Sequence, residues 1–112
     1  MKKLLTVALL ALGLATTAQA VEVRGWHDGL TCQDCHDQGI KKYPSDQACL
    51  SCHNVDDLAE ATAREGKDKW QNPHNNLHFG KETPCTECHG EHQPKEHLCA
   101  QCHTFDYPDH KQ

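Results

Sequence analysis

Near its C-terminus the chain reads Cys85-Thr86-Glu87-Cys88-His89-Gly90-Glu91-His92-Gln93-Pro94-Lys95-Glu96-His97-Leu98-Cys99-Ala100-Gln101-Cys102-His103, a stretch that contains two complete C-x-x-C-H units. Each unit is typical of a c-type haem attachment site. Two thiols three residues apart can reach the two vinyl groups of one porphyrin, and the histidine that follows then lies under the iron as its proximal ligand. Two more units occupy residues 32–36 and 49–53. The sequence therefore predicts four haem c groups.

The cysteines also permit two other interpretations. An exported protein with an even number of cysteines commonly has a disulfide framework, and paired C-x-x-C units can form a zinc site. Neither arrangement needs a histidine after every second cysteine. With 10 histidines in 112 residues, four such histidines would arise by chance about once in ten thousand cases. Haem attachment is therefore favoured over disulfides and over zinc.

Each haem would take two thioether bonds and one proximal ligand from its own unit. The predicted thioether residues are Cys32, Cys35, Cys49, Cys52, Cys85, Cys88, Cys99 and Cys102. The predicted proximal ligands are His36, His53, His89 and His103. If every iron is closed on both faces, four distal ligands are also needed. Six histidines remain for these places, namely His27, His74, His78, His92, His97 and His110.

Two of the six are less suitable as distal ligands. His97 lies two residues before Cys99, where ligation would be strained, and His110 lies near a polar terminus and is expected to be exposed. His92 is three residues beyond His89, so it leans away from that iron and serves a neighbouring haem. The predicted distal ligands are His27, His74, His78 and His92.

His74 and His78 are four residues apart, so on a helical turn they would share one face. They could instead project towards two different haems. The residues do not decide which distal histidine serves which haem.

Methionine, the usual alternative to a distal histidine, raises the reduction potential. The chain has one methionine, Met1, which would leave with a signal peptide. The mature protein is therefore expected to have bis-histidine, low-spin haems of low potential, or sites open on one face.

Residues 1–20 have the pattern of a secretory signal. Lys2 and Lys3 precede an apolar run over residues 4–15, and Ala18-Gln19-Ala20 fits a cleavage site. The apolar run of about 12 residues is short of the roughly 20 needed to span a bilayer, so an uncleaved anchor is the less favoured alternative. We expect a signal peptide over 1–20 and an exported, periplasmic tetrahaem domain over 21–112, without stable membrane insertion.

The mature chain has few large aliphatic side chains for its length. A chain of this size is at the edge of supporting its own hydrophobic core and commonly needs covalent or metal staples. The expected fold is a small multihaem cytochrome, mostly irregular with a few short α-helices and little or no sheet. The haems would form its core.

One segment has clear helix signals. Residues 54–66 begin with an N-cap candidate, Asn54, place acids in the first turn and end at Gly66. The apolar residues of this segment could rest on a haem face or belong to an ordinary spacer helix. Residues 43–46 contain turn formers and are expected to be a loop. Phe105 and Tyr107 are expected to pack on the edge of the fourth haem.

Without residues 1–20 the chain has nine basic and sixteen acidic side chains, a net charge of −7 with neutral histidine. Nucleic acid and anionic lipid are therefore poor partners, whereas a basic patch on a redox protein is a good one. A merely solvated acidic surface is an equally good interpretation of this charge. The expected state is a monomer that forms transient complexes.

The chain resembles the small tetrahaem cytochromes c, and it is similar to the tetrahaem domain of the soluble flavocytochrome c fumarate reductases. The resemblance covers essentially the whole mature chain. Besides the four units, it rests on Trp26-His27 before the first unit, His-x-x-x-His-Phe over 74–79, Cys-x-x-Cys-His-x-x-His over 85–92 and Cys-x-x-Cys-His-x-Phe-Asp over 99–106. It implies distal ligation by the same four histidines and closely spaced haems that form a conducting chain.

These observations favour a periplasmic electron carrier rather than an enzyme, because closed iron sites cannot bind substrate. It would pass electrons from a membrane quinol dehydrogenase to terminal reductases or outer-membrane cytochromes. The alternative is a haem electron-transfer subunit of a flavin-dependent fumarate-type reductase, with the flavin on another chain because G-x-G-x-x-G is absent here. A reductase with one open haem is disfavoured by the spare histidines. Electron storage is not distinguishable from shuttling.

Overall fold

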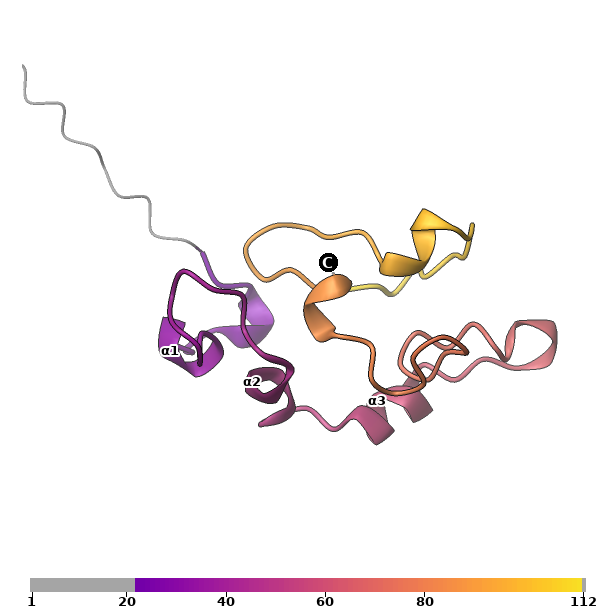
Figure 1. Ribbon diagram of the computed structural model, residues 1–112, viewed down its shortest axis with the longest axis horizontal. Coiled ribbons are helices and arrows are strands. Elements are labelled where there is room, and N and C mark those ends of the chain that lie inside the picture. Colours follow the sequence, from indigo (N-terminus) through magenta and orange to yellow (C-terminus); the bar gives the residue numbers. More distant parts are fainter. Residues whose placement is uncertain (1–21, 112) are drawn as a thin grey trace, which may run out of the picture.

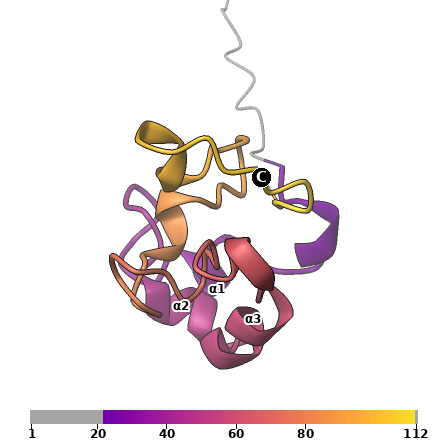
Figure 2. The ribbon, with the colours of Figure 1, turned by 90° about the vertical axis from the view of Figure 1, so that its right-hand side faces the viewer.

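The computed structural model describes residues 22–111, so the predicted signal peptide over 1–20 lies outside the described residues. Short helical turns are connected by long irregular segments (Figures 1 and 2). Their bounds are η1 Gly25–His27, α1 Cys32–Cys35, α2 Asp46–Leu50, α3 Val55–Ala61, η2 Gly66–Asp68, η3 Cys85–Glu87 and η4 Leu98–Gln101. No strand occurs between residues 22 and 111, where one isolated bridge joins Asn76 to Gly80. The expected fold, mostly irregular with short helices and no sheet, is confirmed.

Helix α3 is the longest helix, and it is shorter than its sequence predicted. The side chain of Asn54 caps it as expected, accepting hydrogen bonds from the backbone of Asp56 and Asp57 at 2.8 and 3.3 Å. It ends at Ala61 rather than at Gly66. The hydroxyl of Thr62 donates to the carbonyl of Leu58 at 2.7 Å and also contacts side chains of the following loop. The predicted extension to residue 66 is therefore wrong.

Helix α2 begins inside a segment that was expected to be a loop. Ser45 has an extended backbone and precedes the first turn. Its amide donates to the Asp37 carboxylate at 3.0 Å, and its hydroxyl bonds to the same carboxylate. Because Asp37 holds Ser45 from outside the helix, Asp46 becomes the first helical residue. The loop prediction for residues 43–46 is wrong at its last residue.

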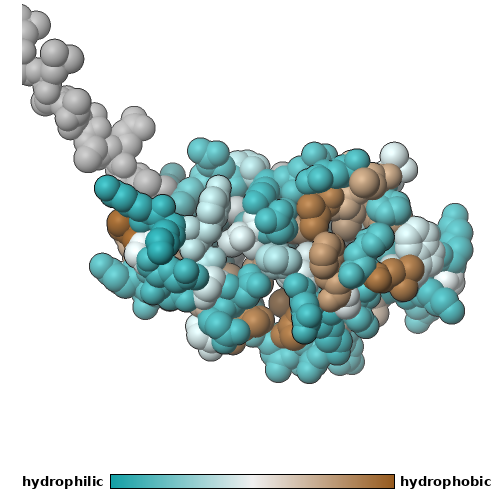
Figure 3. Space-filling model, in the orientation of Figure 1, coloured by the Kyte–Doolittle hydropathy of each residue, from teal (hydrophilic) through white to brown (hydrophobic). Residues whose placement is uncertain are grey.

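The polypeptide by itself has almost no core. Among the described residues only Ala59 and Asn72 are buried, each with 7% of its surface exposed, and none of the large side chains is fully buried. Leu77 and Tyr43 are about four-fifths exposed. Figure 3 shows apolar side chains at the surface, between polar ones. Most large apolar side chains of the described residues are therefore not buried in a polypeptide core.

None of the helices formed by residues 22–111 combines the length and the apolar composition that crossing a membrane requires.

Candidate functional site

The four C-x-x-C-H units adopt one local geometry. Each lies on or beside a short helical turn, and the amide of its histidine donates to the carbonyl of its first cysteine. These hydrogen bonds measure 2.8 Å for His36, 3.0 Å for His53, 3.0 Å for His89 and 2.8 Å for His103. The bond closes a single turn that brings both thiols and the imidazole of a unit towards one side. Four separated segments of the chain therefore form the same attachment geometry.

Each of these four histidines lies opposite one of the four predicted distal histidines. The ring centres are 6.2 Å apart for His36 and His92, and 6.1 Å apart for His53 and His27. They are 6.2 Å apart for His89 and His74, and 6.1 Å apart for His103 and His78. The described structure thus pairs each unit with one distal histidine, which the sequence left open.

This spacing is what a metal ion between two rings requires. A metal-bound imidazole nitrogen lies about 2 Å from its ion, and the ring centre lies about 1 Å further away. Two rings on opposite sides of one ion therefore have centres about 6 Å apart. All four observed separations agree with this value.

The pairs differ in how their ring planes are turned. The planes are almost parallel in the pairs of His36 with His92, at 6°, and of His89 with His74, at 1°. They are crossed at 72° in the pair formed by His27 and His53. The pair of His78 with His103 lies between these limits, at 39°.

Hydrogen bonds at Nδ1 show which ring nitrogen remains free in two distal and two proximal histidines. The Nδ1 atom of His27 lies 2.8 Å from a Glu91 carboxylate oxygen, and that of His92 lies 3.2 Å from the Glu22 carbonyl. Carbonyl and carboxylate oxygens only accept, so Nδ1 carries the proton and Nε2 keeps its lone pair for a metal. The Nδ1 atoms of His36 and His89 likewise donate to the backbone carbonyls of Lys42 and Lys111, at 2.7 and 2.8 Å.

His74 is held in the same orientation by a hydroxyl. Its Nδ1 lies 3.0 Å from the Thr62 hydroxyl, which also has two oxygen acceptors in reach, the Leu58 carbonyl at 2.7 Å and the Asn72 side chain at 2.8 Å. Burial, with a smaller contribution from His89, lowers the pKa of His74 below its usual value. The neutral imidazole, which is the form that binds a metal, is therefore favoured.

His74 and His78 project to different partners because each follows its own asparagine turn. The amide of His74 donates to the Asn72 side chain at 3.0 Å, and the amide of His78 donates to the Asn76 side chain at 3.0 Å. The repeated Asn-x-His pattern over 72–78 was a sequence signal for two separate turns. The possibility of one shared helical face is not realised.

Thiols of successive units lie near one another. The nearby Cys85 thiol lowers the pKa of Cys49 to about 7, and the nearby Cys49 thiol raises the pKa of Cys85. The pKa of Cys35 is raised by burial and by the nearby Cys49, and that of Cys88 is raised by burial, with a smaller contribution from Cys99. Helix α2 contacts both α1 and η3, so the first and third attachment sites lie beside the second.

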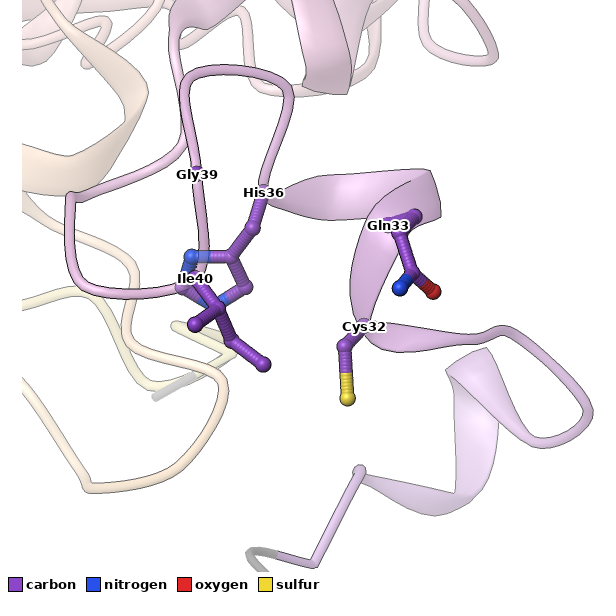
Figure 4. Close-up of a pocket in the computed structure, with 5 residues that line it drawn as sticks. All are labelled: Cys32, Gln33, His36, Gly39 and Ile40. Carbon is purple, nitrogen blue, oxygen red and sulfur yellow. The ribbon is translucent and has the colours of Figure 1, made fainter.

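Two hollows provide the space around these thiols. A cavity of about 1350 Å³ is lined by thiols and histidines of the second and third units and by Leu50, Val55 and Leu58. Because pockets for drug-sized ligands measure about 300–1,000 Å³, this volume is large enough for more than one ligand of that size. Figure 4 shows the second hollow, of about 220 Å³, where Cys32 and His36 face one open space beside Ile40. The residues present fit covalently bound porphyrins.

The two remaining histidines are placed differently. His110 is half-buried rather than exposed as expected, because its Nε2 lies 2.9 Å from the Cys88 carbonyl and its ring packs against His89 at 5.2 Å. With Nε2 donating to a carbonyl, His110 has no free Nε2 for iron. His97 packs against Tyr107 at 4.8 Å. Both have a buried Nδ1 without a hydrogen-bond partner.

The aromatic residues at the C-terminus lie beside the fourth unit. Phe105 stacks on the ring of His103, with centres 4.3 Å apart and planes 13° apart. Tyr107 donates from its hydroxyl to the Gln71 carbonyl at 2.9 Å, and the Arg64 guanidinium lies over its ring at 4.8 Å. Both aromatic rings therefore fix the C-terminal segment close to the last attachment site.

All eight cysteines lie within the described residues and are free. No group of three or more histidine, cysteine, aspartate or glutamate side chains between residues 22 and 111 is arranged to hold a metal ion.

Sequence similarity relates this chain to known proteins. The family model for cytochrome c3 matches residues 26–104. The chain belongs to the cytochrome c3 family. It is also 59% identical over 115 residues, covering 100% of this chain and 98% of the relative, to the acrylate reductase cytochrome subunit of Shewanella woodyi strain ATCC 51908 / MS32. No solved structure matches the chain.

Membership of this family establishes the general chemistry. This cytochrome c3 family member binds haem c and carries electrons. It acts with redox partners, and its expected likeness to tetrahaem cytochromes is confirmed. Of the two electron-transfer roles expected from the sequence, the subunit of a reductase is better supported by the relative than the free shuttle is.

Proposed function

We propose that this chain is the haem electron-transfer subunit of a reductase whose catalytic site lies on a separate protein. Its four haems would each be held by two thioether bonds and two histidines. The observation that carries this proposal is that four histidine pairs, with ring centres 6.1 to 6.2 Å apart, each include the histidine of a different C-x-x-C-H unit. Each bound haem would take up and release one electron at its iron.

The pairing assigns a ligand set to each proposed site. We name the sites by the order of their attachment units. The histidines that would hold the iron are His36 and His92 at site 1, His53 and His27 at site 2, His89 and His74 at site 3, and His103 and His78 at site 4. Hydrogen bonds at Nδ1 orient five of these rings and keep their Nε2 available, namely those of His27, His36, His74, His89 and His92. With both faces of each iron filled by histidine, the four sites would bind no substrate and would serve electron transfer.

The relative supports the choice of partner. Because the cytochrome subunit of Shewanella woodyi is named for acrylate reductase, we propose that this chain supplies electrons for reduction of a carbon–carbon double bond conjugated to a carboxylate. Such a reduction needs two electrons and two protons, and the partner would bind the substrate and deliver the protons. A flavin on that partner would accept single electrons and release them in pairs.

The location of the proposed reaction is the periplasm. Residues 1–20 have the pattern of a cleaved export signal, so the mature chain would begin at Val21. Its net charge of −7 suits a catalytic partner with a basic docking face. The complex would then form by electrostatic attraction and weaken as salt is added.

We expect the reduced protein to be reoxidised by acrylate only in the presence of a catalytic partner. The protein purified from its native source, with any protein that remains bound, is reduced with a limited amount of dithionite and followed by its visible spectrum. Addition of acrylate should reoxidise the complex within seconds and leave the isolated cytochrome reduced.

Two results would contradict this role. Reoxidation of the isolated cytochrome by acrylate would mean that the chain has its own substrate site. Purification as a free monomer that passes electrons to membrane cytochromes, and not to a reductase, would favour the shuttle. A control with fumarate in place of acrylate tests whether the partner distinguishes the two substrates.

The ring planes predict the ferric paramagnetic resonance spectrum. Parallel axial imidazoles split two iron d orbitals and give a rhombic low-spin signal, whereas crossed imidazoles leave these orbitals nearly equal and give a signal with a larger maximum g value. With plane angles of 6° and 1° at sites 1 and 3 and 72° at site 2, we expect two rhombic signals and one signal of large g. Site 4, at 39°, should lie between them.

The intact mass of the same sample should show four haem additions to a chain that begins at Val21. A His27→Ala variant should lose the large-g signal and keep the two rhombic signals. If this variant instead loses a rhombic signal, the pairing of His27 with His53 is incorrect.

A further inference from the structure

Glu91 has a position that the ligand set alone does not require. Glu91 lies in the sequence between His89 of site 3 and His92 of site 1, yet its carboxylate contacts His27, the distal histidine of site 2. One oxygen lies 2.8 Å from Nδ1 of His27, and the other accepts from the backbone amide of Arg24 at 2.5 Å. The Arg24 side chain donates to the Glu91 carbonyl at 3.1 Å. Glu91 thus fastens the N-terminal segment over the second unit.

The acceptor at His27 is the only carboxylate oxygen among the Nδ1 acceptors found for the histidine pairs of the described residues. The other bonded Nδ1 atoms use neutral oxygens, from backbone carbonyls at His36, His89 and His92 and from a hydroxyl at His74. A hydrogen bond to a carboxylate is roughly twice as strong as one between neutral groups. His27 is therefore the most strongly polarised of these imidazoles.

No lysine or arginine side chain neutralises this carboxylate within the part of the chain that the structure describes. The lysine ion pair found there joins Lys81 to Asp56, and the Glu91 carboxylate contacts the His27 ring. The Arg24 guanidinium group bonds to the Glu91 main chain and not to its carboxylate. The His27 and Glu91 side chains are 32% and 25% exposed, so solvent screens their interaction only in part. Glu91 also lines the large cavity beside the second and third units.

We propose that Glu91 is a positioning residue that orients His27 and lowers the reduction potential of site 2 below those of sites 1 and 3. The inference rests on the proposed pairing of His27 with His53. A carboxylate on Nδ1 makes the imidazole a stronger electron donor, and this stabilises ferric iron more than ferrous iron. Crossed rings alone favour the ferrous state relative to parallel rings, so a low potential at site 2 would have to come from the carboxylate.

The consequence for electron flow is that site 2 is reduced after sites 1 and 3. Site 2 would then be an uphill step for an electron that passes between site 1 and site 3.

The test is a redox titration followed by paramagnetic resonance, because the large-g signal reports site 2 separately from sites 1 and 3. In the unmodified protein, this signal should persist to lower potential than the two rhombic signals. In Glu91→Gln, the midpoint potential of the large-g signal should rise by about 59 mV, which corresponds to a tenfold change in the one-electron equilibrium constant. The rhombic signals should move by less than half of this amount.

Glu96→Gln is the matched control, because it removes the same charge from an exposed residue of the same loop, one for which no contact with a histidine is found. It should leave the large-g midpoint unchanged. Glu91→Ser serves as a second variant, in which a neutral hydroxyl or water replaces the carboxylate, and it should also raise the midpoint.

The outcomes separate the inference from the proposed function. A large-g signal that titrates above the rhombic signals in the unmodified protein would overturn the role of Glu91, whatever the variants do. An unchanged midpoint in a variant that keeps four haems would do the same. Absence of any large-g signal, or its survival in His27→Ala, would instead refute the pairing itself.

Discussion

Produced in the cytoplasm without haem attachment, the chain from Val21 should have no cooperative unfolding transition. Only Ala59 and Asn72 are buried among the described residues. The α-helices have four, five and seven residues, well below the roughly 12–15 at which isolated helices become marginally stable in water. Far-ultraviolet circular dichroism should show a largely unordered chain, and the signal should change gradually on heating.

The haem-loaded protein is the reference for this experiment. It should unfold in a single steep transition, because each porphyrin would join two thioether bonds to a distal histidine from another segment. A variant with Cys99→Ser and Cys102→Ser should carry one haem fewer, by intact mass, and unfold at a lower temperature. A haem-free chain with a sharp thermal transition would show that the polypeptide has a core of its own.

The attachment sites could be predicted from the sequence because their geometry is local. The spacing of Cys85, Cys88 and His89 is set by the porphyrin itself, and a hydrogen bond from the His89 amide to the Cys85 carbonyl closes that turn at 3.0 Å. Composition also predicted a fold without a polypeptide core. Both inferences use residues that are close in sequence or simple counts of them.

The pairing of distal histidines could not be predicted in this way. His92 lies opposite His36, and His27 is held by Glu91 across 64 residues. Such contacts depend on the path of the irregular segments, and no hydrophobic periodicity in the sequence predicts that path. The local helix signals also predicted the wrong end for α3, because the Thr62 side chain bonds to the later loop and the helix ends before Gly66.

The environment of His110 also depends on contacts between distant segments and was predicted incorrectly. Its place near a polar terminus indicated an exposed residue, but its Nε2 contacts the Cys88 carbonyl and its ring contacts His89. His97 and His110 have ring centres 6.0 Å apart, the spacing of an axial pair. Neither follows a C-x-x-C pair, and the Nε2 of His110 is already bonded. Distance alone therefore does not define a ligand pair, and the chemistry of each nitrogen is also needed.

Replacement of His92 by alanine should open one iron and leave three closed. Among the described residues, no other histidine ring lies within about 6 Å of His36, so the vacated position has no substitute imidazole. Ferric iron at site 1 would then take water or remain five-coordinate, and about one quarter of the haem should become high-spin. The reduced variant should bind about one carbon monoxide per protein, whereas the unmodified protein should bind none.

His97→Ala is the control for this prediction, because His97 is half-buried beside Tyr107 and faces none of the four proximal histidines. It removes the same side chain type and should leave every iron low-spin and closed to carbon monoxide. The paramagnetic spectrum adds a second criterion, since His92→Ala should remove one of the two rhombic signals and keep the large-g signal of the crossed pair. Low-spin iron throughout His92→Ala, or an open site in His97→Ala, would mean that the sixth ligand at site 1 comes from another residue.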